Sequence, residues 1–170
     1  MRQRAAAVRD DAYWMGKALR EAEKAAARDE VPIGAVVVRD GVVVGRGYNL
    51  RELKQDPSAH AEMIAIRQAA RRLGSWRLTG CVLYVTLEPC TMCMGAIILA
   101  RFDRVIFGCY DPKGGAAGSL YDLSDDRRLN HRVELTPRIR EEECSAILST
   151  FFADLRQRKK KPRVPSPTKI

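Results

Sequence analysis

The segment that most constrains the fold is residues 81–110, where two runs rich in β-branched and aromatic residues, CVLYVT and RVIFGCY, flank the apolar segment CTMCMGAIILA. Short apolar runs of this kind predict buried strands, and the segment between them predicts a helix that is buried on nearly all sides. A strand, a helix and a second strand within about 30 residues form a right-handed parallel unit. The chain must therefore build a sheet that is covered by helices.

The segments on either side of this unit predict further helices and strands. Residues 11–28 repeat apolar side chains at spacings of three and four, which indicates an amphipathic helix. Asp40-Gly41 separates two β-branched runs, which predicts a tight hairpin of antiparallel strands. Three more elements are a helix over 58–73, a strand in HRVEL at 131–135, and a last helix from Thr136-Pro137 to near Arg156. The predicted fold class is α/β, with three layers, α/β/α, around a central mixed sheet of five strands.

The length and charge of the chain point to one domain followed by a basic tail. The 170 residues suffice for one full core, and no apolar run of about 18 residues predicts a membrane span. Residues 156–170 hold seven Lys or Arg and no acid, so the net charge of +9 falls to +2 over residues 1–155. We expect a domain over 1–155 and a disordered tail over 156–170, which either strengthens RNA binding non-specifically or only keeps the protein soluble.

The start of the chain and its cysteines indicate a cytoplasmic protein. The apolar run in MRQRAAAVRDD is too short for a secretory signal. Five cysteines are an odd number in a chain without such a signal, which argues against a disulfide framework. Metal binding or burial of the thiols are the better interpretations.

Two helix starts carry the residues that indicate chemistry. His60 and Glu62 stand at the start of one predicted helix, and Cys90 and Cys93 at the start of another that Pro89 is suited to open. Partial positive charge at a helix start favours thiolates, which are ready metal ligands. His60, Cys90 and Cys93 together leave one position of a tetrahedral zinc ion open for a water molecule. Glu62, not a ligand, can then take the proton of this water and pass it on.

Each part of this pattern also has an ordinary explanation. A Cys-x-x-Cys pair can be a redox site, although that motif usually follows the first strand of a thioredoxin-like unit. A histidine near a helix start is commonly a capping or core residue. The combination is more specific than its parts, because two helix starts at one edge of a sheet can converge on one ion.

The set His-Ala-Glu (60–62) and Pro-Cys-Thr-Met-Cys (89–93) resembles the signature of the zinc-dependent nucleobase deaminases. The likeness to the bacterial tRNA-specific adenosine deaminases extends over about 150 residues, through VPIGAVVV, GYN, SAHAEMIAIRQAAR, LYVTLEPCTMCMGAIILAR, FGCYDPKGGAAGS, NHRVEL and ECSAILSTFF. It implies a cytidine-deaminase-like fold and hydrolytic conversion of adenosine to inosine at the wobble position of an arginine tRNA. It also implies a homodimer with one Zn²⁺ per subunit, with Glu62 as the proton shuttle.

The same resemblance implies substrate-binding roles for Asn49, Asp111 and Lys113, which the residues alone would indicate as turn positions. Two rival functions remain at this stage. One is a deaminase of the same fold that acts on a free base or nucleoside, and it would differ in accepting a small substrate. The other is a zinc-containing RNA-binding module without catalysis, against which Glu62 speaks, since a structural zinc site needs no carboxylate over the metal.

Overall fold

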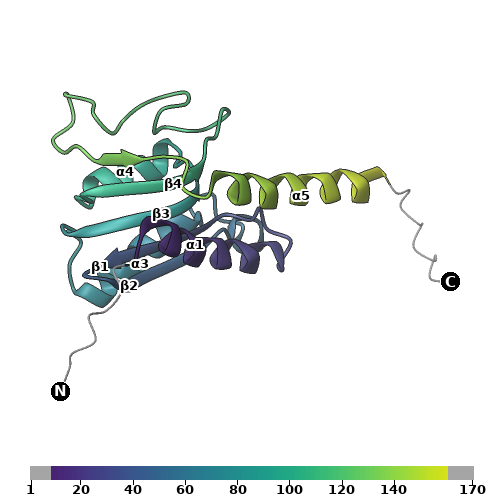
Figure 1. Ribbon diagram of the computed structural model, residues 1–170, viewed down its shortest axis with the longest axis horizontal. Coiled ribbons are helices and arrows are strands. Elements are labelled where there is room, and N and C mark those ends of the chain that lie inside the picture. The colour runs from purple at the N-terminus through teal and green to yellow at the C-terminus, as the bar shows by residue number, and fades with distance from the viewer. Residues whose placement is uncertain (1–8, 161–170) are drawn as a thin grey trace, which may run out of the picture.

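The computed structural model describes residues 9–160, which form one sheet covered by helices (Figure 1). The order of elements is α1 (Asp11–Ala26), β1 (Gly34–Arg39), β2 (Val42–Tyr48), α2 (Arg51–Lys54), α3 (Ala61–Leu73), β3 (Cys81–Leu87), α4 (Thr91–Leu99), β4 (Arg104–Cys109), β5 (Glu134–Thr136) and α5 (Glu141–Lys160). Every predicted helix and strand has a counterpart, and only the short α2 was not predicted. The predictions for residues 1–8 and 161–170 lie outside the described residues.

The five-stranded sheet has the order β2-β1-β3-β4-β5. β1 is antiparallel to β2 and β3, whereas β3, β4 and β5 run parallel, which confirms the predicted mixed sheet. The β1–β2 hairpin closes through Asp40 and Gly41, whose φ angles are 50° and 70°. A tight hairpin of this type requires positive φ at both positions, and an Asp-Gly pair tolerates it.

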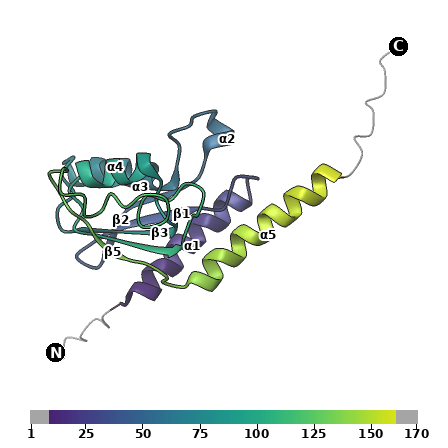
Figure 2. The ribbon, with the colours of Figure 1, turned by 90° about the horizontal axis from the view of Figure 1, so that it is seen from above.

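Two hydrophobic cores lie on the two faces of the sheet, so the predicted three layers are confirmed. Figure 2 shows α3 and α4 on one face and α1 and α5 on the other. Successive side chains of a strand point to opposite faces. In β1, Ala35 and Val37 therefore pack in the core under α3 and α4, while Val36 and Val38 pack in the core under α1. This continuous apolar run serves both layers at once.

Three of the strand ends that meet at one edge of the sheet lead into the predicted site residues. Since β1 is antiparallel to both of its neighbours, β2 runs in the same direction as β3 and β4. The carboxyl ends of β2, β3 and β4 consequently open at the same edge, which is where ligands bind in sheets of this kind. The segments that follow these ends contain Asn49, Glu88 to Cys90, and Asp111.

Two helices begin later than predicted, because the residues before them form other contacts instead of a helical turn. The helix predicted from residue 58 begins at Ala61, since the Asp56 carboxylate accepts hydrogen bonds from the backbone N–H and the hydroxyl of Ser58. Pro89 does not open α4, which begins at Thr91. Cys90 precedes it with an extended backbone and forms an isolated bridge with Gly115. The prediction for Pro89 is therefore wrong.

The predicted start of the last helix at Thr136-Pro137 is also wrong. Thr136 pairs with Ile106 as the last residue of β5. Arg138 and Arg140 then have φ angles of 67° and 55°, in the left-handed region that an α-helix cannot include. The helix begins only after this break. Here the strand pairing overrides the local proline signal.

Helix α5 continues to Lys160 rather than ending near Arg156, so residues 156–160 are helical and the predicted disorder is wrong for them. Figure 1 shows this helix projecting beyond the sheet. Within residues 9–160, none of the helices is both long enough and apolar enough to traverse a lipid bilayer.

Helix α4 is not buried on all sides, contrary to the prediction. Cys93, Met94, Ile97 and Ile98 are buried, but Leu99 is 66% exposed. Met92, Ala96 and Leu99 follow one another at the spacing of a single helix face, and all three are at least partly exposed. Figure 2 shows α4 beside α3 on one face of the sheet, and Leu99 is the most exposed of the three residues.

Candidate active site

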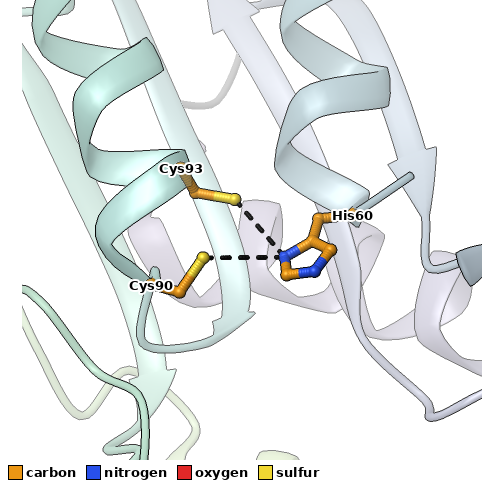
Figure 3. A group of neighbouring side chains, drawn as sticks. All are labelled: His60, Cys90 and Cys93. Atoms are coloured by element: carbon orange, nitrogen blue, oxygen red, sulfur yellow. Dashed lines mark hydrogen bonds between the residues drawn. The ribbon is translucent and has the colours of Figure 1, made fainter. Parts of the chain in front are cut away.

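The predicted metal ligands occupy equivalent places at the starts of two helices. His60 is the N-cap residue of α3, and Cys90 is the N-cap residue of α4. Neither side chain makes a capping hydrogen bond to its own helix, so both remain available for a ligand. Cys93 lies one turn further into α4 and is fully buried. The two helix starts face each other across the edge of the sheet (Figure 3).

The three side chains have the spacing of a tetrahedral metal site. Both sulfur atoms face Nδ1 of His60, Cys90 Sγ at 3.7 Å and Cys93 Sγ at 3.6 Å (Figure 3). Tetrahedral Zn²⁺ with bonds of about 2.3 Å to sulfur and about 2.0–2.1 Å to nitrogen would separate a sulfur from a nitrogen by about 3.6 Å. The ligand atoms all lie within 4.8 Å of one another. The residues present therefore fit Zn²⁺, with a fourth position left for water.

The protonation of the two thiols is strongly unequal. Hydrogen bonds from Cys93 and His60 lower the pKa of Cys90 to about 4, so Cys90 is a thiolate at neutral pH. The hydrogen bond to Cys90 and burial raise the pKa of Cys93. The hydrogen bond to Cys90 also raises the pKa of His60. Binding of Zn²⁺ by these side chains would displace the protons that they carry in its absence.

Glu62 lies in the first turn of α3 and is 4% exposed. Burial raises the pKa of its carboxyl group to about 7. A general acid-base group works best when its pKa lies near the working pH, because it can then both accept and release a proton. His60 and Glu62 line the same cleft, although positions two residues apart do not lie on one face of a helix.

A cleft of about 700 Å³ brings the predicted substrate-binding residues to the metal ligands. It is lined by Asn49, His60, Glu62, Cys90, Asp111 and Lys113, among others. Cys93 lies beneath it, and a second cavity, of about 360 Å³ between α1 and α5, contains none of the predicted site residues. The structure thus assembles in one place residues from the ends of three strands and the starts of two helices.

Leu148 and Phe152 of α5 also line this cleft. Together with Ile147, Phe151 and Leu155 they form an apolar stripe whose helical spacing predicts core packing rather than stacking on RNA. None of these five side chains is buried, and Phe152 is 40% exposed. Ile147 and Leu148 pack against the core on the α1 side of the sheet, as predicted, whereas the core prediction is wrong for Phe151, Phe152 and Leu155, because α5 projects beyond the sheet.

Two buried carboxylates beside the cleft were not predicted. Glu30 is 1% exposed and accepts hydrogen bonds from the Asn49 amide at 3.3 Å and from the backbone N–H groups of Glu52 and Leu53. Glu88 is 2% exposed and accepts hydrogen bonds from the loop that follows β4. No periodicity reveals a buried carboxylate, although the position of Glu88 directly before Pro-Cys-x-x-Cys is a sequence signal in hindsight.

The arrangement supports hydrolytic chemistry at a bound base. Zn²⁺ held by His60, Cys90 and Cys93 would acidify a water molecule so that it is nucleophilic at neutral pH. Glu62 can take a proton from that water and return it elsewhere on the substrate. A redox role for Cys90 and Cys93 does not explain why His60 lies within 4 Å of both sulfurs, with Glu62 beside it in the cleft.

Comparisons with known proteins agree with this geometry. Residues 9–156 match the family model of the MafB19-like deaminases. The chain is 50% identical over 153 residues to the tRNA-specific adenosine deaminase of Bacillus subtilis (strain 168), which covers 90% of this chain and 95% of that protein. A solved structure from studies of A-to-I editing by tRNA:A34 deaminases at the wobble position has a TM-score of 0.77 and 46% identity, covering 80% of this chain and 99% of that one.

A solved guanine deaminase from Bacillus subtilis, which represents the rival function, is less similar. Its TM-score is 0.60 at 27% identity, covering 93% of this chain and 99% of that one. The resemblance to tRNA-specific adenosine deaminases and the predicted cytidine-deaminase-like fold are thereby confirmed. Because the likeness runs over nearly the whole chain, this protein belongs to the tRNA-specific adenosine deaminases, a family of zinc-dependent hydrolytic enzymes.

Proposed function

We propose that this deaminase acts in the cytoplasm on the wobble adenosine of an arginine tRNA, as a homodimer with one Zn²⁺ per subunit. The observation that carries the choice of tRNA over a free base is the rim of the cleft. Arg51, Lys113 and Arg156 line it, and these cationic side chains suit a phosphate backbone. Phe152 lines it as well, 40% exposed, and offers a surface on which a splayed base can stack.

We assign the metal to His60, Cys90 and Cys93 and the proton transfers to Glu62. Glu62 takes a proton from the attacking water as its oxygen bonds to C6 of adenine. It delivers this proton to the ring nitrogen, then takes the remaining proton of the former water from the new C6 hydroxyl and passes it to the amino group, which leaves as ammonia, so that inosine remains. Its burial favours this shuttle, since the carboxyl group changes protonation near neutral pH.

We assign recognition of the base to Asn49, and contacts to the surrounding RNA to Asp111 and Lys113. The Asn49 amide donates one hydrogen bond to Glu30. A primary amide has two N–H donors and a carbonyl acceptor, so one N–H and the carbonyl oxygen remain for the edge of a base. Lys113 is exposed at the mouth of the cleft, where its charge can meet a phosphate group.

The outer face of α4 supports the homodimer. Met92, Ala96 and Leu99 form an apolar stripe in which Met92 and Ala96 are partly exposed and Leu99 is 66% exposed. An apolar helix face of this kind suits an interface with a second copy. Leu99→Asp should yield monomers in sedimentation equilibrium, whereas Val42→Asp, at a 52% exposed position on the hairpin, should not. Wild-type protein that sediments as a monomer would contradict the homodimer.

The function is tested with an arginine tRNA that carries a wobble adenosine. The zinc-loaded protein should convert this adenosine to inosine, which sequencing reads as guanosine, while free adenosine and free guanine remain unchanged. Glu62→Ala is the inactive control. Deamination of free guanine without reaction of the tRNA would favour the rival free-base enzyme. Binding of the tRNA with no deamination of any substrate would favour the non-catalytic RNA-binding module.

A further inference from the structure

The Glu88 carboxylate, at the end of β3, is the common acceptor for the loop of residues 111–119. Its Oε2 accepts a hydrogen bond from the backbone N–H of Asp111 at 2.8 Å and another from the Ser119 hydroxyl. Its Oε1 accepts from the backbone N–H groups of Ala117 at 3.0 Å and Ser119 at 2.9 Å. All four donors belong to one loop, and they approach both oxygens of one side chain that is 2% exposed.

The loop is shaped to enclose this carboxylate. A Cβ atom on Gly115 would lie 2.2 Å from both Cδ and Oε2 of Glu88, so the backbone packs directly on the carboxyl group. Only glycine permits such an approach. The donors and the close backbone contact together define where the two ends of the loop lie.

Glu88 is also joined directly to the metal ligand. Only Pro89 separates it from Cys90 in the chain, and the same loop bonds to this residue through the Ala116 N–H and the carbonyl oxygen of Pro89 at 2.8 Å. Cys90 itself forms a bridge with Gly115. The loop and the ligand are therefore fixed to one short stretch of backbone, and Asp111 and Lys113 of the loop line the cleft beside the metal ligands.

We propose that Glu88 is a positioning residue, which sets the place of the RNA-contacting loop 111–119 relative to the metal. This inference rests on the proposed roles of Asp111 and Lys113 in binding tRNA. The side chain contributes neither a proton nor a metal bond to the reaction. It acts by holding Asp111 at one end of the loop and Ser119 at the other at a fixed distance from Cys90.

Glu88→Gln is the informative variant because it keeps the size of the side chain and changes one acceptor into a donor. Whichever way the amide is oriented, its NH₂ group must face a backbone N–H, either that of Asp111 or those of Ala117 and Ser119. A buried N–H that loses its acceptor and meets another donor destabilises this local arrangement. The loop should therefore loosen without removal of any metal ligand.

The experiment combines amide hydrogen exchange with steady-state kinetics on the zinc-loaded full chain. In Glu88→Gln, exchange of the 111–119 segment should become at least about tenfold faster, and KM for the tRNA should rise about tenfold with kcat changed less than about threefold. Zinc content should stay at the wild-type value. Glu30→Gln is the matched control, since it alters another buried carboxylate that accepts backbone N–H bonds. It should speed exchange near residues 51–54 and leave 111–119 unchanged.

Ser119→Ala and Gly115→Ala perturb the same contacts between Glu88 and the loop, and they replace Glu88→Gln in the test if that variant does not fold. Ser119→Ala removes one of the four donors and should raise KM about twofold, while Gly115→Ala displaces the carboxylate and should reproduce the larger effect. Exchange of 111–119 that is unchanged in Glu88→Gln, or in both other variants, would overturn the inference. A fall in kcat with loss of zinc would overturn it too.

Asp111→Ala and Lys113→Ala separate this inference from the proposed function. If both variants bind tRNA like the wild type while Glu88→Gln still loosens the loop, the roles proposed for Asp111 and Lys113 fail but the anchoring by Glu88 stands. If both variants weaken binding and Glu88→Gln leaves exchange and KM unchanged, the reverse holds.

Discussion

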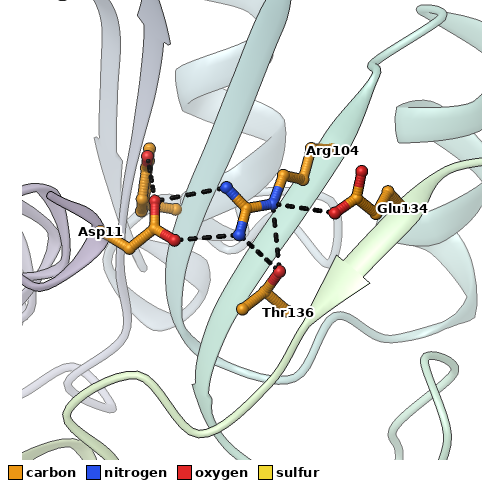
Figure 4. A network of polar contacts seen from close by, with 5 residues as sticks. Asp11, Arg104, Glu134 and Thr136 are labelled. Atoms are coloured by element: carbon orange, nitrogen blue, oxygen red, sulfur yellow. Dashed lines mark hydrogen bonds and ion pairs between the residues drawn. The ribbon is translucent and has the colours of Figure 1, made fainter.

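Two clusters of polar side chains join distant segments of this chain. They differ in whether each charge and each hydrogen-bond donor finds a partner of opposite kind within the cluster. One is the cluster of His60, Cys90 and Cys93, with Glu62 beside it. The other centres on Arg104 at the start of β4, on the α1 side of the sheet (Figure 4). The first uses side chains from the starts of α3 and α4, and the second uses side chains from α1, β3, β4 and β5.

The Arg104 cluster is fully matched. Its guanidinium group donates hydrogen bonds to Asp11 at 2.9 Å and to Thr136 at 2.7 Å, and it lies 3.5 Å from Glu134 (Figure 4). The hydroxyl group of Tyr84 donates to the same Asp11 carboxylate at 2.9 Å. Each donor meets an acceptor, and the single cation is offset by carboxylates. This cluster ties α1 to β4 and β5 and requires no ligand.

The metal cluster is unmatched without a cation. Two sulfur atoms face one imidazole nitrogen, and a buried carboxyl group stands beside them. The result is a wide separation of proton affinities, with the pKa of Cys90 lowered and those of Cys93 and Glu62 raised. A cluster of ligands with perturbed pKa values in a cleft marks a functional site, whereas a cluster with mutually satisfied partners marks a structural one.

Of the changes that distinguish the two clusters, removal of the metal should have the largest effect on activity and on stability. Treatment with a chelator should abolish deamination, and subsequent addition of Zn²⁺ should restore it. Loss of a ligand that occupies the native site at about 1,000 times its Kd would lower the unfolding free energy by about 4 kcal/mol, or Tm by roughly 10 °C. Calorimetry with and without chelator measures this. Unchanged activity in metal-free protein would contradict the assignment of the site.

Glu62→Gln should reduce kcat on the tRNA by about 10³-fold, since a proton shuttle supplies about 10²–10⁴-fold to a rate. Zinc content should not change, because Glu62 is not a ligand. Thr136→Val, which removes an acceptor from the Arg104 cluster, is the matched control and should leave kcat per folded enzyme unchanged. Comparable losses of activity in the two variants would show that the clusters do not differ in function.

The low pKa of Cys90 predicts how metal-free protein is alkylated at different pH values. Because this pKa is about 4, the reactive thiolate persists from pH 8 down to about pH 5 and is lost only as the pH falls through about 4. An ordinary cysteine with a pKa of about 8.5 instead loses about tenfold in rate per pH unit below 8. Mass spectrometry after iodoacetamide pulses should therefore show modification of Cys90 at pH 5, with protection by Zn²⁺. An ordinary pH profile at Cys90 would contradict the unequal protonation.

Arg104→Met should show the smallest effect, on stability alone. Loss of a half-buried ion pair and its hydrogen bonds should lower the unfolding free energy by about 2 kcal/mol, as measured by urea denaturation. Arg128→Met, which breaks the exposed pair with Asp126, is the control and should have no measurable effect. A Glu62-like loss of kcat in Arg104→Met would contradict the structural role of that cluster.

The sequence predicted most elements because hydrophobic period and turn chemistry act locally. The Asp40-Gly41 hairpin and the β3–α4–β4 unit could be placed from these signals. The errors fall where contacts across the chain decide. Pairing of Cys90 with Gly115 moved the start of α4 past Pro89, and pairing of Thr136 with Ile106 moved the start of α5 to Glu141.

For this protein the sequence by itself was sufficient to predict a reactive set of His60, Glu62, Cys90 and Cys93, because metal binding requires particular side-chain types at particular spacings. Only the tertiary structure decided how Glu30 and Glu88 hold Asn49 and the 111–119 loop beside that set. Nor could the sequence tell that Leu148 and Phe152 of the α5 stripe line the cleft. A buried acceptor is defined by the donors that surround it, and these come from segments up to 31 residues away in the chain.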